Sequence, residues 1–169
     1  MDNIPGVEVV PLGWCVDAMY RAFERVRETG SNDPIGAYAS VAETLFWINV
    51  VREQLEGKYR SHYEATLAEQ TEDVAQMMSG LIFARNRITH EVDQVGYLLA
   101  TAKGPDGFAA NWTWQFLLPR PGDKQGDRRG DYEAVIAGRD VIATLSIVTI
   151  FLGLARNRMW QNYGNEESA

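Results

Sequence analysis

Four strongly polar side chains stand close together in an otherwise apolar stretch, residues 80–91. They are Arg85, Asn86, Arg87 and His90. Such groups are costly to bury unless they are paired, so we expect them to line a polar groove. Histidine exchanges a proton near neutral pH, and arginine offers a permanently charged, planar fork that matches phosphate. Together they suit cleavage of a phosphodiester whose nucleophile is already present, such as the 2′-hydroxyl of RNA.

Each side chain has a role in such a reaction. His90 would deprotonate the 2′-hydroxyl or protonate the leaving oxygen, and Arg85 would stabilise the charged phosphorane. Asn86 would orient the histidine or hold a phosphate oxygen. We expect no cofactor and no metal ion, because two histidines and one cysteine make a zinc site improbable and no glycine-rich phosphate loop is present.

The spacing of these residues on a helix suggests a shared site. Asn86 and His90 are four residues apart and lie on one face, whereas Arg85 is about 140° from His90 at 100° per residue. One helix therefore does not direct Arg85 and His90 at a single atom. Two such helices packed across a two-fold axis could do so, which predicts a homodimer. The alternative is a structural polar network at a helix interface.

The remaining arginines are weaker candidates for RNA binding. The net charge of −7 does not suggest a nucleic-acid-binding protein, but the acidic excess lies entirely in residues 1–79. Residues 80–169 carry equal numbers of acidic and basic side chains. Arg87, Arg156 and Arg158 could therefore contribute to a local basic rim. For the last two, the alternative is a helix C-terminus favoured by cations.

Most of the chain has apolar residues at helical spacing. This pattern predicts helices at about 14–29, 34–56, 61–102 and 132–160. Asp33 followed by Pro34 is a helix start signal, and Ser61 with Glu64 fits a capping box. The third helix is long for a globular protein, so we expect a kink or break near Ser79 and Gly80.

The region between the last two predicted helices has a different pattern. Aromatic and apolar residues alternate with others over 112–118, which predicts a strand or an extended segment. Residues 119–130 resemble a loop, and Asp131 can cap the last helix. That helix is apolar on nearly all sides in its middle, which places it at the centre of a bundle or in a subunit interface.

These elements predict a single all-α domain over residues 1–169. We expect four or five helices and one short extended or strand excursion near 108–118. Residues 1–13 would form an extended arm, and residues 162–169 a frayed tail.

The composition also bears on location. A single cysteine excludes an internal disulfide and fits a reducing compartment. The first residues lack the order of a signal peptide, and the apolar run 141–155 is shorter than the roughly 20 residues that cross a bilayer. We therefore expect a cytoplasmic protein without a membrane segment.

The run Arg85-Asn86-Arg87-Ile88-Thr89-His90 resembles the signature of the HEPN superfamily. That signature is an arginine, a polar residue that is often asparagine, a short spacer and a histidine. The resemblance assigns site roles to Arg85, Asn86 and His90. The helical content extends the match over roughly residues 33–160, whereas the 112–118 segment and the acidic charge are not family features.

The resemblance implies both a fold and an activity. Members are small α-helical bundles with the motif on a late helix, and many are metal-independent endoribonucleases that act as dimers with a composite site. Many are toxins or antiviral effectors, which implies RNA as the substrate and a neutralising protein as a partner. The alternative is a non-catalytic binding or regulatory module with the same fold, which dimerises through the apolar last helix and the 112–118 segment.

Overall fold

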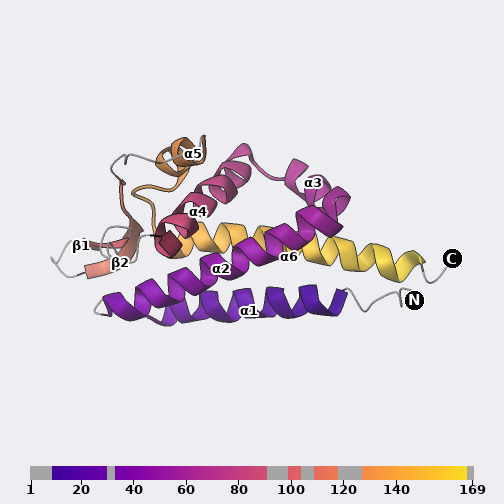
Figure 1. The fold of residues 1–169 in the computed structure, drawn as a ribbon, viewed down its shortest axis with the longest axis horizontal. Coiled ribbons are helices and arrows are strands. Elements are labelled where there is room, and N and C mark those ends of the chain that lie inside the picture. The colour runs from indigo at the N-terminus through magenta and orange to yellow at the C-terminus, as the bar shows by residue number, and fades with distance from the viewer. Residues whose placement is uncertain (1–8, 30–32, 91–98, 104–108, 118–126, 167–169) are drawn as a thin grey trace.

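The structure, a computed structural model, describes residues 9–29, 33–90, 99–103, 109–117 and 127–166. This part of the chain is an all-α bundle with one short hairpin (Figure 1). Its helices are α1 (Val9–Glu28), α2 (Pro34–Lys58), α3 (Arg60–Ala68), α4 (Glu72–His90), α5 (Asp127–Val135) and α6 (Val141–Glu166), and its strands are β1 (Leu99–Lys103) and β2 (Ala109–Trp114). The prediction of an all-α bundle with an extended excursion near 108–118 is confirmed, but the described residues form six helices and not the four or five expected.

Helix α6 lies at the centre of the bundle. It packs against α1, α2, α3, α4 and β2. In Figure 1, α1 runs below it, α2 crosses it, and α3 and α4 lie above it. Its inner side is fully buried, including Leu145, Val148, Leu152 and Met159. The apolar middle of the last helix therefore forms the core, as the sequence predicts.

The predicted cap is right for α2 and wrong for α3, although α3 begins at Arg60, close to the predicted start at about residue 61. The Asp33 carboxylate accepts a hydrogen bond from the Gly36 N–H at 2.8 Å, so the cap at the start of α2 is confirmed. Helix α3 has no side-chain cap. Glu64, the glutamate of the expected capping box, instead forms an ion pair with Arg60 one turn earlier, at 2.7 Å. This pairing uses the carboxylate that the box needs.

The long third helix predicted over 61–102 is wrong in two places. The chain leaves the helix at residues 69–71, between α3 and α4, and residues 99–103 form a strand. Gly80 lies inside α4 without ending it. A Cβ atom at Gly80 would lie 2.9 Å from Tyr132 Cα, so this glycine lets α5 approach α4 closely. The prediction of a break at Gly80 is wrong because glycine also serves close helix packing.

The helix predicted over 132–160 is two helices. Helix α5 begins at Asp127, inside the predicted loop, and a turn at Gly138 with φ of 78° separates it from α6. Asp140, and not Asp131, caps α6, since its Oδ1 accepts from the Ala143 N–H at 2.8 Å. Glycine adopts this φ without strain, which fixes the direction of the turn.

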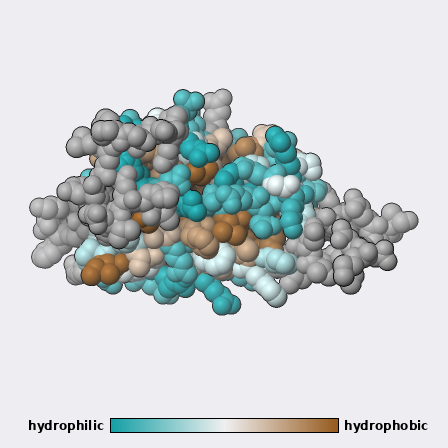
Figure 2. Space-filling model, viewed as in Figure 1, coloured by the Kyte–Doolittle hydropathy of each residue, from teal (hydrophilic) through white to brown (hydrophobic). Residues whose placement is uncertain are grey.

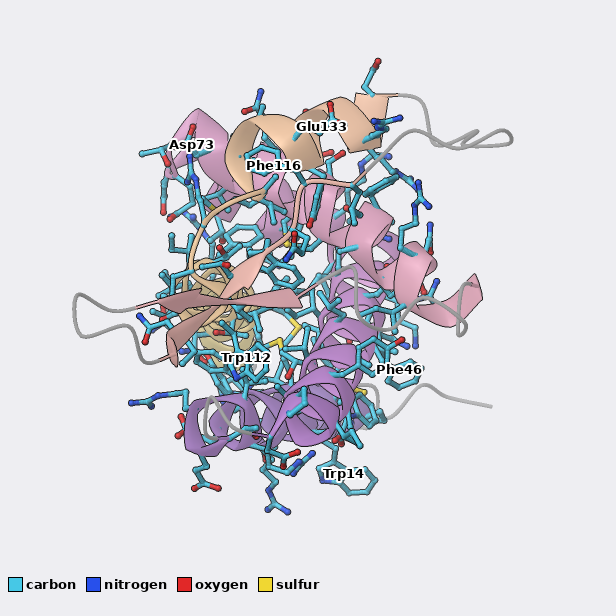
Figure 3. The ribbon with its side chains drawn as sticks, turned by 90° about the vertical axis from the view of Figure 1, so that its left-hand side faces the viewer. Trp14, Phe46, Asp73, Trp112, Phe116 and Glu133 are labelled. Carbon is cyan, nitrogen blue, oxygen red and sulfur yellow. The ribbon has the colours of Figure 1, made fainter. Side chains whose placement is uncertain are left out.

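The end of strand β2 holds this turn in place. The Gly138 N–H donates to the Trp114 carbonyl at 2.7 Å, and the Trp114 N–H donates to the Arg139 carbonyl at 3.0 Å. Strands β1 and β2 pair antiparallel, with Leu99 opposite Trp114. Figure 3 views the molecule from this end, where the hairpin crosses in front of the bundle. The hydrogen bonds of Trp114 thus attach the turn before α6 to the end of strand β2.

Two terminal predictions also differ from the structure. Helix α1 already begins at Val9, within the predicted extended arm. Helix α6 continues to Glu166, within the predicted frayed tail. Helical hydrogen bonding therefore extends at both ends beyond the stretch of clear apolar periodicity, because helix boundaries need not coincide with the packed face.

The surface combines polar and apolar side chains. On the face shown in Figure 2, hydrophobic residues are interspersed among hydrophilic ones. Among the described helices, one is long and apolar enough to cross a membrane by length and composition alone, at Val141–Gln161, and half of its most apolar window is buried inside the protein. This stretch is longer than the apolar run 141–155 counted from the sequence. The buried core helix of a protein can meet the same criterion of length and composition.

Candidate functional site

Arg85 lies on the inward face of α4. It follows Leu81 by one turn and precedes Ile88 by three residues, and both are apolar residues of the core or packed against it. The Arg85 side chain is half-buried. This position is unusual for a charged residue. Charged side chains are seldom found on the apolar face of a helix unless an ion pair or a hydrogen bond compensates for their burial.

Asn86 holds the Arg85 guanidinium. Arg85 Nη1 donates to Asn86 Oδ1 at 3.0 Å, and both side chains are half-buried. The bond joins neighbours that project from α4 in directions about 100° apart. It draws the guanidinium from the apolar stripe toward the edge of the helix. The first two residues of the predicted constellation are thus in direct contact.

Arg87 has a different environment. It is buried, with 7% of its surface exposed, and its guanidinium carbon lies 5.2 Å from the centre of the Phe83 ring. The Phe83 ring in turn packs against Tyr132 of α5, with ring centres 5.4 Å apart. A cation over an aromatic face is an attractive contact. Arg87 therefore contributes to α4–α5 packing and presents little surface to RNA.

His90 is the last residue of α4, and its side chain lies outside the described part of the structure. The helix is unbroken from Arg85 to His90, so the separation of about 140° around the axis applies to the backbone positions. Whether Arg85 and His90 meet across two chains stays a prediction.

Tyr38 of α2 supports the end of α4. Its hydroxyl donates to the Ile88 carbonyl at 3.4 Å, and burial raises the pKa of this tyrosine. The last carbonyls of a helix lack partners within the helix, and a neutral hydroxyl can donate to one of them. The sequence places Tyr38 on the core face of its helix but does not predict this contact. The only sequence signal for it is a tyrosine, which carries a hydroxyl, at an inward-facing position.

Arg158 lies far from Arg85, at the other end of α4. It forms an ion pair with Glu69 at 2.8 Å, just before α4 begins, whereas Arg85 is thirteen residues into α4, about 20 Å farther along. Arg156, two residues earlier on α6, stacks over the Trp160 ring at 5.3 Å. One chain therefore does not bring these two arginines together with Arg85.

A polar network on α2 was not predicted from the sequence. Arg52, whose side chain is 14% exposed, forms an ion pair with Glu56 and donates to Asn49 Oδ1 at 3.1 Å. Asn49 in turn donates to Glu53 at 2.8 Å. Burial and the nearby Glu56 carboxylate raise the pKa of Tyr63 on α3. The network therefore runs along α2 through neighbours one turn apart and reaches α3 at Tyr63.

The described residues contain no group of three or more His, Cys, Asp or Glu side chains placed to hold a metal ion. No protein-family profile, curated protein or solved structure matches this chain. The candidate site is therefore defined by its own geometry: a bonded Arg85–Asn86 pair at the edge of α4, followed about one turn later by His90.

Proposed function

We propose that this protein is a HEPN-like, metal-independent endoribonuclease that cleaves RNA as a homodimer. The observation that carries the proposal is the Arg85–Asn86 hydrogen bond, which keeps a guanidinium at the edge of α4, five residues before His90. A fixed arginine fork costs little reorganisation when a phosphate binds.

The reaction uses a nucleophile that the substrate supplies. His90 takes the proton of the 2′-hydroxyl, and the 2′-oxygen attacks the adjacent phosphorus. Arg85 stabilises the extra negative charge on the phosphorane oxygens. The bond to the 5′-oxygen then breaks, and a second His90, from the other protomer, supplies the proton to that oxygen. The products are a 2′,3′-cyclic phosphate and a 5′-hydroxyl.

A site shared by two chains follows from the helical positions. Within one chain Arg85 and His90 are separated by about 140° around α4. A two-fold axis near the end of α4 would place His90 of one protomer opposite Arg85 of the other. Of the other arginines, Arg156 and Arg158 remain candidates for contacts along a longer RNA, and Arg158 would have to release Glu69.

The resemblance also suggests a biological setting. We propose a cytoplasmic toxin or antiviral effector whose partner is a neutralising protein, with no membrane association. Uncontrolled cleavage of cellular RNA is harmful to the cell that produces the enzyme, so a protein that blocks the site would be needed.

The second candidate is a non-catalytic helical binding or regulatory module. Its support is the burial of Arg87 over Phe83, because one arginine of the cluster serves packing. In that case the Arg85–Asn86 bond would likewise be structural, and the cluster would hold α4 in place without acting on a substrate.

The deciding experiment is cleavage of a mixed RNA pool in the presence of EDTA. Wild type is compared with His90→Ala, Arg85→Ala and Arg85→Lys. The lysine variant keeps the charge but loses the bidentate fork. Cleavage that leaves 2′,3′-cyclic phosphate ends, and that is lost in all three folded variants, supports the enzyme. No cleavage by wild type, with the variants only less stable, supports the module.

A further inference from the structure

Arg156 holds its guanidinium between α6 and α1. The start of α1 lies beside the second half of α6 (Figure 1), and a Cβ atom at Gly13 would lie 3.5 Å from Arg156 Nη2. Arg156 Nη1 donates to Asn157 Oδ1 at 3.0 Å, and the guanidinium carbon lies 5.3 Å from the centre of the Trp160 ring. These three neighbours restrict the position of the charge.

This charge has no acidic partner in the described part of the chain. Other arginines of this acidic protein do have one, since a carboxylate pairs with each of Arg25, Arg27, Arg52, Arg60, Arg129 and Arg158. Even the described carboxylate of Asp17, one turn along α1 from Gly13, is exposed and does not pair with Arg156. The cation is therefore available to an anion from outside the chain.

Neither the position of Arg156 on α6 nor its packing explains an unpaired charge. Helix α6 continues to Glu166, whereas the helix dipole favours cations only in the last turn. Arg87, which packs over an aromatic ring in the core, is 7% exposed, but Arg156 is only half-buried. Of the Arg156 nitrogens that lack a hydrogen bond to a described residue, Nε is enclosed and Nη2 is not. Nη2 can therefore donate to a ligand.

The Trp160 ring offers an open surface beside this guanidinium. The side chain is 50% exposed, although Arg156 lies over one face of the ring. Proteins that bind single-stranded nucleic acid combine cations that hold the backbone with aromatic rings on which bases stack. The fork of an arginine matches a phosphate group. An acidic peptide would match the guanidinium equally well, but it has no flat base to cover Trp160.

We propose that Arg156 and Trp160 bind one nucleotide of a single-stranded RNA, with a phosphate on Arg156 and the base stacked on Trp160. The identity of the strand rests on the proposed function, because the strand would be the ribonuclease substrate. The neighbouring Arg158–Glu69 ion pair lies just before α4, about 20 Å along that helix from Arg85. The site therefore holds the strand away from the scissile phosphate and favours long RNA over short RNA.

The test measures binding without cleavage. A 2′-O-methyl oligouridylate of about eight nucleotides spans a typical single-strand site and lacks the 2′-hydroxyl nucleophile, so the proposed reaction cannot cut it. In fluorescence anisotropy, Arg156→Gln should weaken binding of the labelled oligomer by about 10-fold. Trp160→Leu should weaken it by about 5-fold or more. Arg27→Gln is the matched control, because Arg27 already pairs with Glu24, and it should leave the affinity unchanged.

Salt dependence separates the two contacts and does not depend on the absolute affinity. Each phosphate contact to a single strand contributes about −0.7 to the slope of log affinity against log salt concentration. Arg156→Gln should therefore make the slope shallower by about 0.7, whereas Trp160→Leu should leave it unchanged. The oligomer should also quench tryptophan fluorescence in wild type but not in Trp160→Phe. This measurement needs no variant of Arg156.

Three results would each overturn the proposal: no binding by wild type, equal affinity of Arg156→Gln and wild type, or displacement of the oligomer by an equal concentration of octaglutamate. Octaglutamate supplies carboxylates without bases, so its success would assign the site to an acidic peptide. The outcome is separate from that of the proposed ribonuclease. Oligomer binding without RNA cleavage would refute the enzyme alone, and cleavage with unchanged binding by Arg156→Gln would refute this site alone.

Discussion

Replacement of Gly80 by alanine should separate α4 from α5 and lower the stability of the protein. The new Cβ atom would lie 2.9 Å from Tyr132 Cα and 2.7 Å from Ile136 Cδ1. Ordinary carbon contacts are about 3.5–4.0 Å, so α5 would have to retreat by roughly 1 Å. The nearest backbone atom cannot move alone, since Tyr132 is fully buried and belongs to a helix.

The sign of the effect depends on two opposing terms. Alanine in place of glycine stabilises a helix interior by up to about 1 kcal/mol. Overpacking of a close contact costs about 1–3 kcal/mol. We expect a net loss of about 1–2 kcal/mol in the free energy of unfolding, which lowers Tm by roughly 3–6 °C for a domain of this size.

Gly130→Ala is the matched control, because Gly130 lies in α5 and a Cβ atom there would have no neighbour within 4 Å. It should stabilise the protein by up to about 1 kcal/mol. Urea titrations followed by circular dichroism measure both variants. If Gly80→Ala is as stable as Gly130→Ala, the close approach of α4 and α5 is not a constraint, and the reasoning fails.

Three further predictions concern other contacts. A Cβ at Gly153 would overlap the Tyr20 hydroxyl oxygen, so Gly153→Ala should cost about 1–3 kcal/mol in urea titrations. Adding Tyr20→Phe should recover part of that loss, and full additivity of the two changes would contradict the contact. Asp140→Ala removes the cap of α6 and should lower the free energy of unfolding by about 1 kcal/mol, whereas Asp140→Asn should be nearly neutral; equal losses in both variants would show that the cap is not the cause. Burial raises the pKa of Tyr132 in the folded state, so the unfolded chain releases this proton first. Stability should therefore be lost as pH rises above about 10, and pH-dependent unfolding that is identical in Tyr132→Phe would contradict this.

The sequence predicted those features that depend on local patterns. The cap at Asp33 and the apolar middle of α6 follow from a residue type at a fixed position and from helical spacing. The sequence also placed Arg85 and Asn86 in one candidate site, but it did not predict the hydrogen bond between them.

The errors concern features that depend on distant parts of the chain. The sequence predicts a helix break at Gly80, but the role of this glycine is set by Tyr132, which lies far along the sequence. The turn at Gly138 is held by the end of β2. Arg87 is buried against the Phe83 ring, which packs on α5. Arg87 and Phe83 are neighbours one turn apart on α4, but the packing of Phe83 on Tyr132 joins distant parts of the chain. The contacts of Gly80, Gly138 and Phe83 with distant residues have no local sequence signal, so helix ends and side-chain exposure were harder to predict than fold class.

The central place of α6 has a consequence for folding during synthesis. Helices α1 to α4 are made before α6, yet each of them packs against it. Until residues 141–159 have left the ribosome, the inner faces of the earlier helices have no complete core to join. The nascent chain therefore exposes apolar surface for most of its synthesis, a condition in which chains bind chaperones or aggregate. Completion of the bundle then waits on contacts between residues far apart in sequence, which slows folding relative to a bundle built from neighbouring helices.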